Sequence, residues 1–198
     1  MGPALVFDVS GVITGDRLPL AVARMVEPHG IEFERAWQVI HREIYPHAAV
    51  GRMTAKEMHE KAARRLELPL TYEQFAAAYL EGYPLRSTVL DFVRSLVPRH
   101  RLFVLSNQTE INTLSLRPLL ERNFERMLFS NEVGRRKPDR AIYRMLFDGA
   151  GLQPEQCVFI DDRMENLAPA EAEGMKALHY TSFGKLKADL RALGVRAD

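Results

Sequence analysis

The sequence predicts an α/β fold, a Rossmann-like three-layer sandwich around a central parallel sheet, with an all-helical cap inserted after the first strand. Two observations lead to this prediction. Short apolar runs rich in Val, Leu and Phe lack polar alternation, which is typical of strands buried on both faces. In addition, residues 15–84 contain only helical patterns, so they interrupt the strand–helix alternation of the rest.

Five apolar runs are the expected strands, the last being the weakest: Ala4–Phe7, Leu102–Leu105, Met127–Phe129, Cys157–Ile160 and Lys176–Tyr180. Helical patterns lie before, between and after the last four runs, at Ser87–Leu96, Glu110–Arg122, Asp139–Gly149, Met164–Glu173 and Lys185–Leu193. Strand, helix and strand repeated in this way imply a parallel sheet with right-handed crossovers.

The interrupting region is expected to form a helical cap. Its helical patterns span Leu18–His29, Glu34–Tyr45, Thr54–Leu66 and Tyr72–Gly82. Thr54 with Glu57 has the pattern of a capping box, and Thr71 can cap the helix that follows it. We expect a core of residues 1–14 and 85–198 and a cap of residues 15–84. A cap is favoured over a lobe remote from any site, because the insertion begins where open α/β sheets bind ligands.

Composition narrows the class of protein. Hydrophobic residues make up 46% of the 198, which is enough for a packed core. The 27 Lys and Arg nearly balance the 26 Asp and Glu, so no global basic field favours nucleic acid or a membrane as partner. No apolar run is long enough to span a bilayer, and the amino terminus lacks a signal-peptide pattern. The single Cys157, expected to be a packed hydrophobe, suits a cytoplasmic protein.

Polar residues follow the first two strands. Asp8 ends the first strand before a glycine turn, which directs a carboxylate into the crevice, although such an Asp also caps loops. Ser106 and Asn107 end the second strand, where a hydroxyl and backbone N–H groups could hold a phosphate oxygen. Capping of the helix that starts at Glu110 is an equally good interpretation of this second motif alone.

Two further motifs carry charge. Lys137 precedes Pro138, which favours an extended backbone and suits a lysine that reaches back to the crevice, while a solvated basic loop is the alternative. Asp161 and Asp162 directly follow the fourth strand. Two adjacent acids at the end of a buried strand are unfavourable unless a positive group lies beside them, and Mg²⁺ is a hard cation that binds carboxylates.

An Asp with a glycine turn, a Ser, a Lys-Pro and an Asp-Asp, in this order at strand ends, resemble the four motifs of the haloacid dehalogenase-like superfamily. The resemblance covers the whole core, and the helical insertion lies where the class 1 caps of that superfamily lie. The cap run Leu68–Phe75 is similar to that of bacterial α-D-glucose-1-phosphate phosphatases within it.

The resemblance implies a role for each motif. Asp8 would attack phosphorus and become an aspartyl-phosphate, with Mg²⁺ bridging it and the phosphate. The metal ligands would be Asp8, the backbone carbonyl of Ser10 and Asp162, with Asp161 bound directly or through water. Phosphate oxygens would be held by Ser106 and by the N–H of Asn107, and Lys137 would neutralise Asp8 and the phosphate. The implied activity is hydrolysis of a small phosphorylated metabolite such as a sugar phosphate.

One position departs from the pattern of the family's phosphatases. Two residues after the nucleophile they usually carry an Asp that acts as general acid and base, and here Ser10 stands there. Serine cannot exchange a proton near neutral pH, and general acid–base help is typically worth ~10²–10⁴ in rate. Three outcomes stay open: substrates with good leaving groups, help from another group of the cap or from water, or poor turnover.

The alternative function is therefore a catalytically weakened phosphate-binding or regulatory protein of the same fold. Dehalogenation is disfavoured, because the resembling dehalogenases need no metal and the pair Asp161 and Asp162 would not suit a metal-free pocket. In the cap, the segment from His41 to Arg52 is rich in groups that bind sugars or phosphates. Trp37 is expected in the cap core rather than as a stacking platform.

Overall fold

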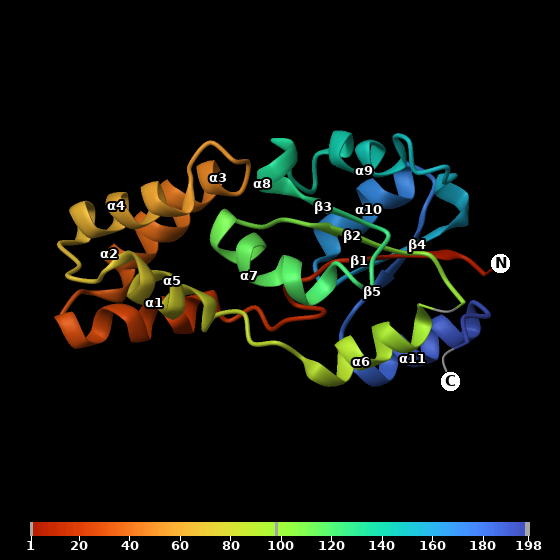
Figure 1. Cartoon of the computed structure of the whole chain (residues 1–198), viewed down its shortest axis with the longest axis horizontal. Helices are drawn as coiled ribbons and strands as arrows, with labels where there is room; N and C mark the ends of the chain where they lie inside the picture. The colour runs from red at the N-terminus through yellow and green to blue at the C-terminus, as the bar shows by residue number, and fades with distance from the viewer. Residues whose placement is uncertain (1, 98, 197–198) are drawn as a thin grey trace.

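The computed structural model describes residues 2–97 and 99–196, and its centre is one five-stranded parallel sheet in the order β3-β2-β1-β4-β5 (Figure 1). The strands are β1 Ala4–Phe7, β2 Leu102–Ser106, β3 Arg126–Phe129, β4 Cys157–Asp161 and β5 Lys176–His179. The predicted fold class is confirmed, and each predicted strand is present. Cys157 is buried, as expected.

Alternate residues of each strand pack on opposite faces of the sheet, as the period of two requires. Leu5 and Phe7 of β1 face one hydrophobic cluster, and Ala4 and Val6 face another. The first cluster includes residues of α6 Ser87–Leu96, α7 Glu110–Leu120 and α11 Phe183–Ala192. The second includes residues of α9 Arg140–Phe147 and α10 Met164–Ala172. Helices therefore cover both faces and complete three layers.

The register of the sheet brings the ends of three strands to the same edge. Phe7, the last residue of β1, pairs with Val104 of β2 and with Ile160 of β4. Asp8 follows Phe7 and leaves the sheet at its carboxyl edge, and Asp161 is the last residue of β4 at the same edge. Figure 1 shows the lobe that contains α1 to α5 beyond this edge.

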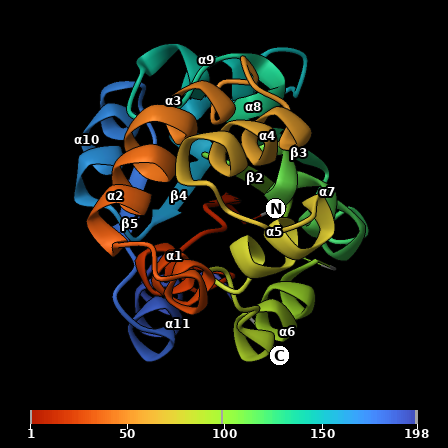
Figure 2. The same ribbon diagram turned by 90° about the vertical axis from the view of Figure 1, so that its left-hand side faces the viewer.

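That lobe is all helical. Its elements are α1 Leu18–Val26, the 3₁₀ turn η1 Glu27–His29, α2 Phe33–Trp37, the π-helical η2 Gln38–Ile44, α3 Tyr45–Ala48, α4 Ala55–Leu66 and α5 Tyr72–Leu80. Figure 2 looks onto these helices, with the sheet behind them. Thr54 and Thr71 both form capping boxes, as predicted for Thr54. The lobe has a hydrophobic cluster of its own, to which α7 contributes Ile111.

Two antiparallel connections join the lobe to the sheet. The N–H of Gly15 donates to the carbonyl of Pro84, and the N–H of Arg17 donates to the carbonyl of Gly82, both at 2.7 Å. The N–H of Arg86 donates to the carbonyl of Ile13 at 2.9 Å. The division into residues 1–14, 15–84 and 85–198 stays a prediction, and these bonds lie where it places the boundaries.

Three short segments, η2, α8 Ser130–Val133 and η3 Pro154–Gln156, differ from what the sequence predicts. The predicted helix Glu34–Tyr45 contains the π-helical segment η2, whose wider i→i+5 bonding an ordinary helical periodicity does not reveal. The short elements α8 and η3 were not predicted, because one turn is too short to show a period.

Among the described residues, no helix combines the length and apolar character needed to cross a bilayer.

Candidate active site at the carboxyl ends of the strands

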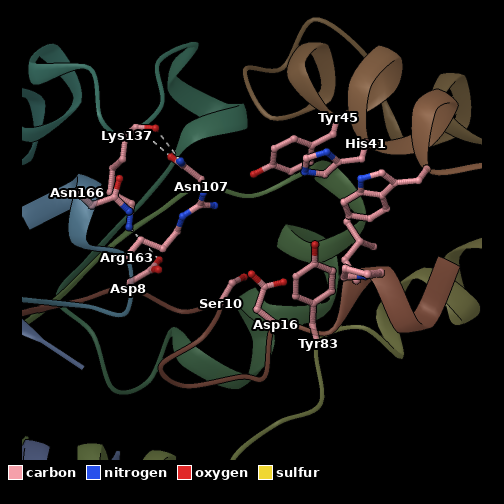
Figure 3. A pocket seen from close by; sticks show the side chains of 13 residues that line it. Asp8, Ser10, Asp16, His41, Tyr45, Tyr83, Asn107, Lys137, Arg163 and Asn166 are labelled. Atoms are coloured by element: carbon pink, nitrogen blue, oxygen red, sulfur yellow. Dashed lines mark hydrogen bonds and ion pairs between the residues drawn. The ribbon is translucent and has the colours of Figure 1, made fainter. Parts of the chain in front are cut away.

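A cavity of about 330 Å³ lies between the sheet edge and the helical lobe (Figure 3). Its volume is at the lower end of the range for small-molecule sites. Residues from both sides line it: Asp8, Ser10, Asp16, Leu18, Pro19, Trp37, His41, Tyr45, Tyr83, Asn107, Lys137, Arg163 and Asn166.

The core side of the cavity is built around a buried ammonium group. Lys137 Nζ lies 3.0 Å from Asp8 Oδ1 and 2.6 Å from Asp161 Oδ2. Lys137 is 3% exposed, Asp8 4% and Asp161 0%. Removing such charges from water is unfavourable, so they persist only because they are paired. Three segments far apart in sequence thus meet at one point.

Lys137 is held by its backbone as well as by its side chain. The Asn107 side chain accepts a hydrogen bond from the Lys137 N–H at 2.8 Å and donates one to the Lys137 carbonyl at 2.9 Å. This pair of bonds joins the end of β2 to the loop that carries the lysine. The ammonium group therefore reaches Asp8 from a fixed position rather than from a solvated loop.

Asp161 is fully hydrogen-bonded. Its Oδ1 accepts the N–H of Arg163 at 2.8 Å, and both of its oxygens accept from Asn166 Nδ2 at 3.0 Å. Arg163 is the N-cap residue of α10, so a helix start also faces this carboxylate. With Lys137 on Oδ2, Asp161 has little capacity for a further ligand.

Unlike Asp161, Asp162 has a carboxylate oxygen without a hydrogen-bond partner in the described part of the chain, which suggests a place for a cation. Oxygens of Asp8, Asp161 and Asp162 lie within 4.8 Å of one another. Asp162 Oδ1 is buried and has no hydrogen-bond partner among the described residues. A Cβ on Gly11, whose φ is +88°, would lie 2.0 Å from Asp162 Oδ2, so the turn leaves room for this carboxylate. A carboxylate with a buried oxygen that lacks a partner, beside two other carboxylates, fits a hard divalent ion such as Mg²⁺.

The electrostatics of the cluster point in the same direction. Burial raises the pKa of Asp8 to about 7, Lys137 opposes this rise and Asp161 adds to it. Burial also raises the pKa of Asp162, and the charge of Asp161 raises it further. Burial lowers the pKa of Lys137, but Asp8 and Asp161 outweigh it and the net direction is upward. One ammonium group does not balance three carboxylates, so additional positive charge would stabilise the cluster.

The other predicted site residues lie close to this cluster. Ser106 is fully buried, and its hydroxyl donates to Asp8 Oδ1 at 2.6 Å, so in this structure it contacts the carboxylate and not the cavity. Ser10 and Asn107 both line the cavity. The predicted roles of Ser106 and of the Asn107 N–H in phosphate binding, and of the Ser10 carbonyl as a metal ligand, stay predictions.

The lobe side of the cavity is a row of aromatic rings. The rings of Trp37 and His41 stack with centroids 4.1 Å apart and planes 6° apart, and those of His41 and Tyr45 at 5.6 Å and 7°. Trp37 packs against the cluster of the lobe, as expected, and it also lines the cavity, which was not expected. Of the predicted segment from His41 to Arg52, His41 and Tyr45 are the residues that line the cavity.

Several residues of the site were not predicted from the sequence. Gln108, two positions after Ser106, is fully buried and donates to the hydroxyls of both Ser106 and Ser10. Asn166 carries no motif of its own, and only its place five residues after Asp161 on the following helix indicates it. Asp16 lies in the connection to the lobe, where spacing alone gives no signal.

Comparison with known proteins places the chain in a family. A sequence model described as haloacid dehalogenase-like hydrolase matches residues 3–174. The Phosphorylated carbohydrates phosphatase of Thermotoga maritima is 26% identical over 184 residues, which cover 89% of this chain and 83% of that protein. Flavin mononucleotide hydrolase 1 of Arabidopsis thaliana is 39% identical over 63 residues, which cover 32% of this chain. The match spans only 26% of the length of the Arabidopsis protein.

The fold is also that of solved structures. One of them, a HAD family enzyme from Bacteroides thetaiotaomicron in complex with magnesium and inorganic phosphate, superposes with a TM-score of 0.80 at 19% sequence identity. The superposition covers 94% of this chain and 99% of that one. At this identity the likeness shows the fold.

Proposed function

The chain belongs to the haloacid dehalogenase-like hydrolase family, and on that premise we propose that it is a Mg²⁺-dependent phosphatase that forms an aspartyl-phosphate on Asp8. The observation that carries the proposal is the buried contact of Lys137 with Asp8 and Asp161, beside the orphaned Asp162. A carboxylate and a phosphate repel one another by roughly 4 kcal/mol per charge pair near a protein surface. A nucleophilic carboxylate therefore needs the positive groups that this site gathers.

Asp8 is held in an orientation that suits attack. Its Oδ1 accepts hydrogen bonds from Ser106 Oγ and Lys137 Nζ. Among the described residues, Oδ2 has no hydrogen-bond donor, so it is the oxygen that attacks phosphorus. The new bond joins Oδ2 to phosphorus while the ester P–O bond breaks and the leaving oxygen takes a proton. Water then attacks the phosphorus of the aspartyl-phosphate, releases phosphate and restores Asp8.

Mg²⁺, when bound, supplies positive charge that offsets the carboxylates and the phosphate. Asp162 and Asp8 would hold it, because Asp162 has a free buried oxygen and Asp8 lies beside it. Asp161 would contribute less directly, since Lys137, Asn166 and a backbone N–H already occupy its oxygens. The Ser10 carbonyl completes the proposed protein ligands.

The proposed substrate is a small phosphorylated metabolite with a polar leaving group, such as a sugar phosphate. Phe33 and His41 stack on Trp37, and Trp37 and Tyr45 stack on His41, so neighbouring rings cover the faces of Trp37 and His41. In Figure 3 the Tyr45 hydroxyl points across the cavity toward the core side. The activity named for the Thermotoga relative supports a carbohydrate phosphate. The resemblance of residues 68–75 to glucose-1-phosphate phosphatases supports the same class.

Ser10 sets the expected range of substrates. Its hydroxyl does not exchange a proton near neutral pH, so the leaving oxygen receives less help than from a carboxylic acid. Esters with good leaving groups, such as sugar 1-phosphates, acyl phosphates and aryl phosphates, should therefore react fastest. Asp16 lines the same cavity and is available to accept hydrogen bonds from hydroxyl groups of the substrate.

The test is phosphate release from a panel of aryl, acyl and sugar phosphates, with Mg²⁺ and with EDTA. The wild type should release phosphate only with Mg²⁺, and Asp8→Asn should lose at least ~10³-fold in kcat, since the nucleophile is gone. Asp91→Asn is the matched control, because Asp91 is an exposed carboxylate paired with Arg94 on α6. Normal turnover by Asp8→Asn would rule out the proposed nucleophile.

The second candidate is a phosphate-binding or regulatory protein with a weakened site, which the residue at position 10 motivates. It predicts binding of inorganic phosphate and Mg²⁺ by calorimetry without turnover across the same panel. Turnover of even one sugar 1-phosphate at a useful rate would exclude it.

A further inference from the structure

A chain of buried amides and hydroxyls runs from α7 to the nucleophile. Asn112 Nδ2 donates to Gln108 Oε1 at 2.9 Å. Gln108 Nε2 donates to Ser106 Oγ at 2.8 Å and to Ser10 Oγ at 3.0 Å. Ser106 Oγ donates to Asp8 Oδ1 at 2.6 Å. Gln108 and Ser106 are fully buried and Asn112 is 2% exposed, so water does not compete for these bonds.

The charge of Asp8 fixes the direction of each bond in this chain. An ionised carboxylate only accepts hydrogen bonds, so the single hydroxyl hydrogen of Ser106 points to Asp8. The oxygen of Ser106 is then limited to accepting, and it accepts from the Val9 N–H and from the side chain of Gln108. Gln108 must therefore present its NH₂ group to the serines, which leaves its Oε1 for Asn112.

The second hydrogen of that NH₂ group determines what Ser10 can do. It donates to Ser10 Oγ, so a lone pair of the Ser10 oxygen is occupied from the protein side. The hydroxyl hydrogen of Ser10 has no acceptor among residues 2–97 and 99–196. Ser10 lines the cavity, and in Figure 3 it lies between Asp8 and the side chains of Asp16 and Tyr83. Its hydrogen is thus available to a molecule in the cavity.

We propose that Gln108 is a positioning residue that holds the Ser10 hydroxyl as a hydrogen-bond donor directed at the leaving oxygen of the phosphomonoester. The inference rests on the proposed function. Phosphorus lies next to Asp8 during attack, and the leaving group occupies the lobe side of the cavity, so Ser10 faces the ester oxygen between them. Ser10 stays neutral throughout and transfers no proton. It stabilises the negative charge that builds on the leaving oxygen, and water supplies the proton.

A hydrogen bond of this kind has a selective effect. Charge on the leaving oxygen is large when an alkyl phosphate is cleaved and small when an aryl phosphate is cleaved, because the phenolate is already stabilised. One neutral hydrogen bond corresponds to about a tenfold change in rate. The quantity to measure is therefore the ratio of kcat/KM for an alkyl phosphate to kcat/KM for an aryl phosphate, with Mg²⁺ present.

The test uses Gln108→Met, Ser10→Ala and the double variant. Methionine has nearly the length of glutamine and cannot orient a hydroxyl, so Gln108→Met should lower the alkyl-to-aryl ratio by roughly fivefold, and Ser10→Ala by roughly tenfold. In the Ser10→Ala background, Gln108→Met should change the ratio less than about twofold, because the two act through one bond. Thr113→Val is the control. It removes a buried hydroxyl of α7 that donates to Thr109 and Asn131 and is not hydrogen-bonded to Ser10 or Gln108, so the ratio should stay unchanged.

The outcomes separate the two proposals. No phosphate release from any ester by the wild type would overturn the proposed function, and the role of Gln108 with it. Turnover in which Gln108→Met lowers both rates equally, or in which the two substitutions multiply in the ratio, would overturn the role of Gln108 alone. If Gln108→Met fails to fold, Gln108→Glu keeps the shape but presents acceptors to Ser10, and it should lower the ratio as well.

Discussion

Replacement of Lys137 by methionine tests how the buried charges are balanced. The ammonium group lies 3.0 Å from Asp8 and 2.6 Å from Asp161, and all three side chains are at least nine-tenths buried. At an effective dielectric constant of about 20, the attraction in each such pair is roughly 6 kcal/mol before the desolvation that opposes it. Removing one partner of a buried pair leaves uncompensated charge and typically costs about 3–5 kcal/mol. The free energy of unfolding of a domain is only about 5–15 kcal/mol, so the variant should still fold but lose a large part of its stability.

The assay is urea unfolding followed by far-UV circular dichroism, in EDTA and above neutral pH. Lys185→Met is the matched control, because Lys185 pairs with Asp189 at a half-exposed position of α11. It should change the free energy of unfolding by about 0.5 kcal/mol or less. Mg²⁺ should restore part of the loss in Lys137→Met by binding the carboxylates. A loss below about 1 kcal/mol in Lys137→Met with EDTA would refute this description of the site.

Three further predictions concern single positions. Gly11→Ala should reduce Mg²⁺ affinity in calorimetry and stability by more than Gly30→Ala, because both glycines have positive φ but only a Cβ at Gly11 would meet Asp162; equal losses would show that the close approach is unimportant. Burial and the charge of Arg42 lower the pKa of His41 in the folded protein, so the unfolded protein binds more protons at this residue. The wild type should therefore lose stability relative to His41→Phe as pH falls through about 6.5. Parallel pH dependences of the free energy of unfolding in urea would contradict this. Ser10→Asp should raise kcat/KM most for alkyl phosphates, by ~10²-fold or less, and an equal rise for aryl phosphates would contradict the role given to position 10.

The sequence could predict that the site residues lie close together, because parallel strands end at one edge of the sheet. Asp8 follows β1 and Asp161 ends the neighbouring strand β4, so a sheet with these strands side by side brings the two carboxylates together. The position of Lys137 does not follow from strand order in this way, since a basic loop can face solvent. Its position depends on two hydrogen bonds with the Asn107 side chain, and sequence spacing gives no sign of them.

The interior hydrogen bonds could not be predicted for a related reason. Gln108 looks like an ordinary polar residue before a helix, and its role depends on facing Ser10, 98 positions away in sequence. The stacking of Trp37, His41 and Tyr45 along the cavity could not be predicted. These residues are four positions apart, but part of the segment that carries them is a π-helix. Periodicity identifies helices and their buried faces, but not a change of winding or a contact between distant segments.

In the proposed mechanism Asp8 carries the phosphoryl group during turnover. The direct measurement is mass spectrometry of peptides from protein that is mixed with acetyl phosphate and Mg²⁺ and then quenched in acid. We predict one phosphoryl group on the peptide that contains Asp8, and none on that peptide from Asp8→Asn. A phosphoryl group found on another residue, or steady phosphate release with no adduct on Asp8 at any quench time, would rule out Asp8 as the nucleophile.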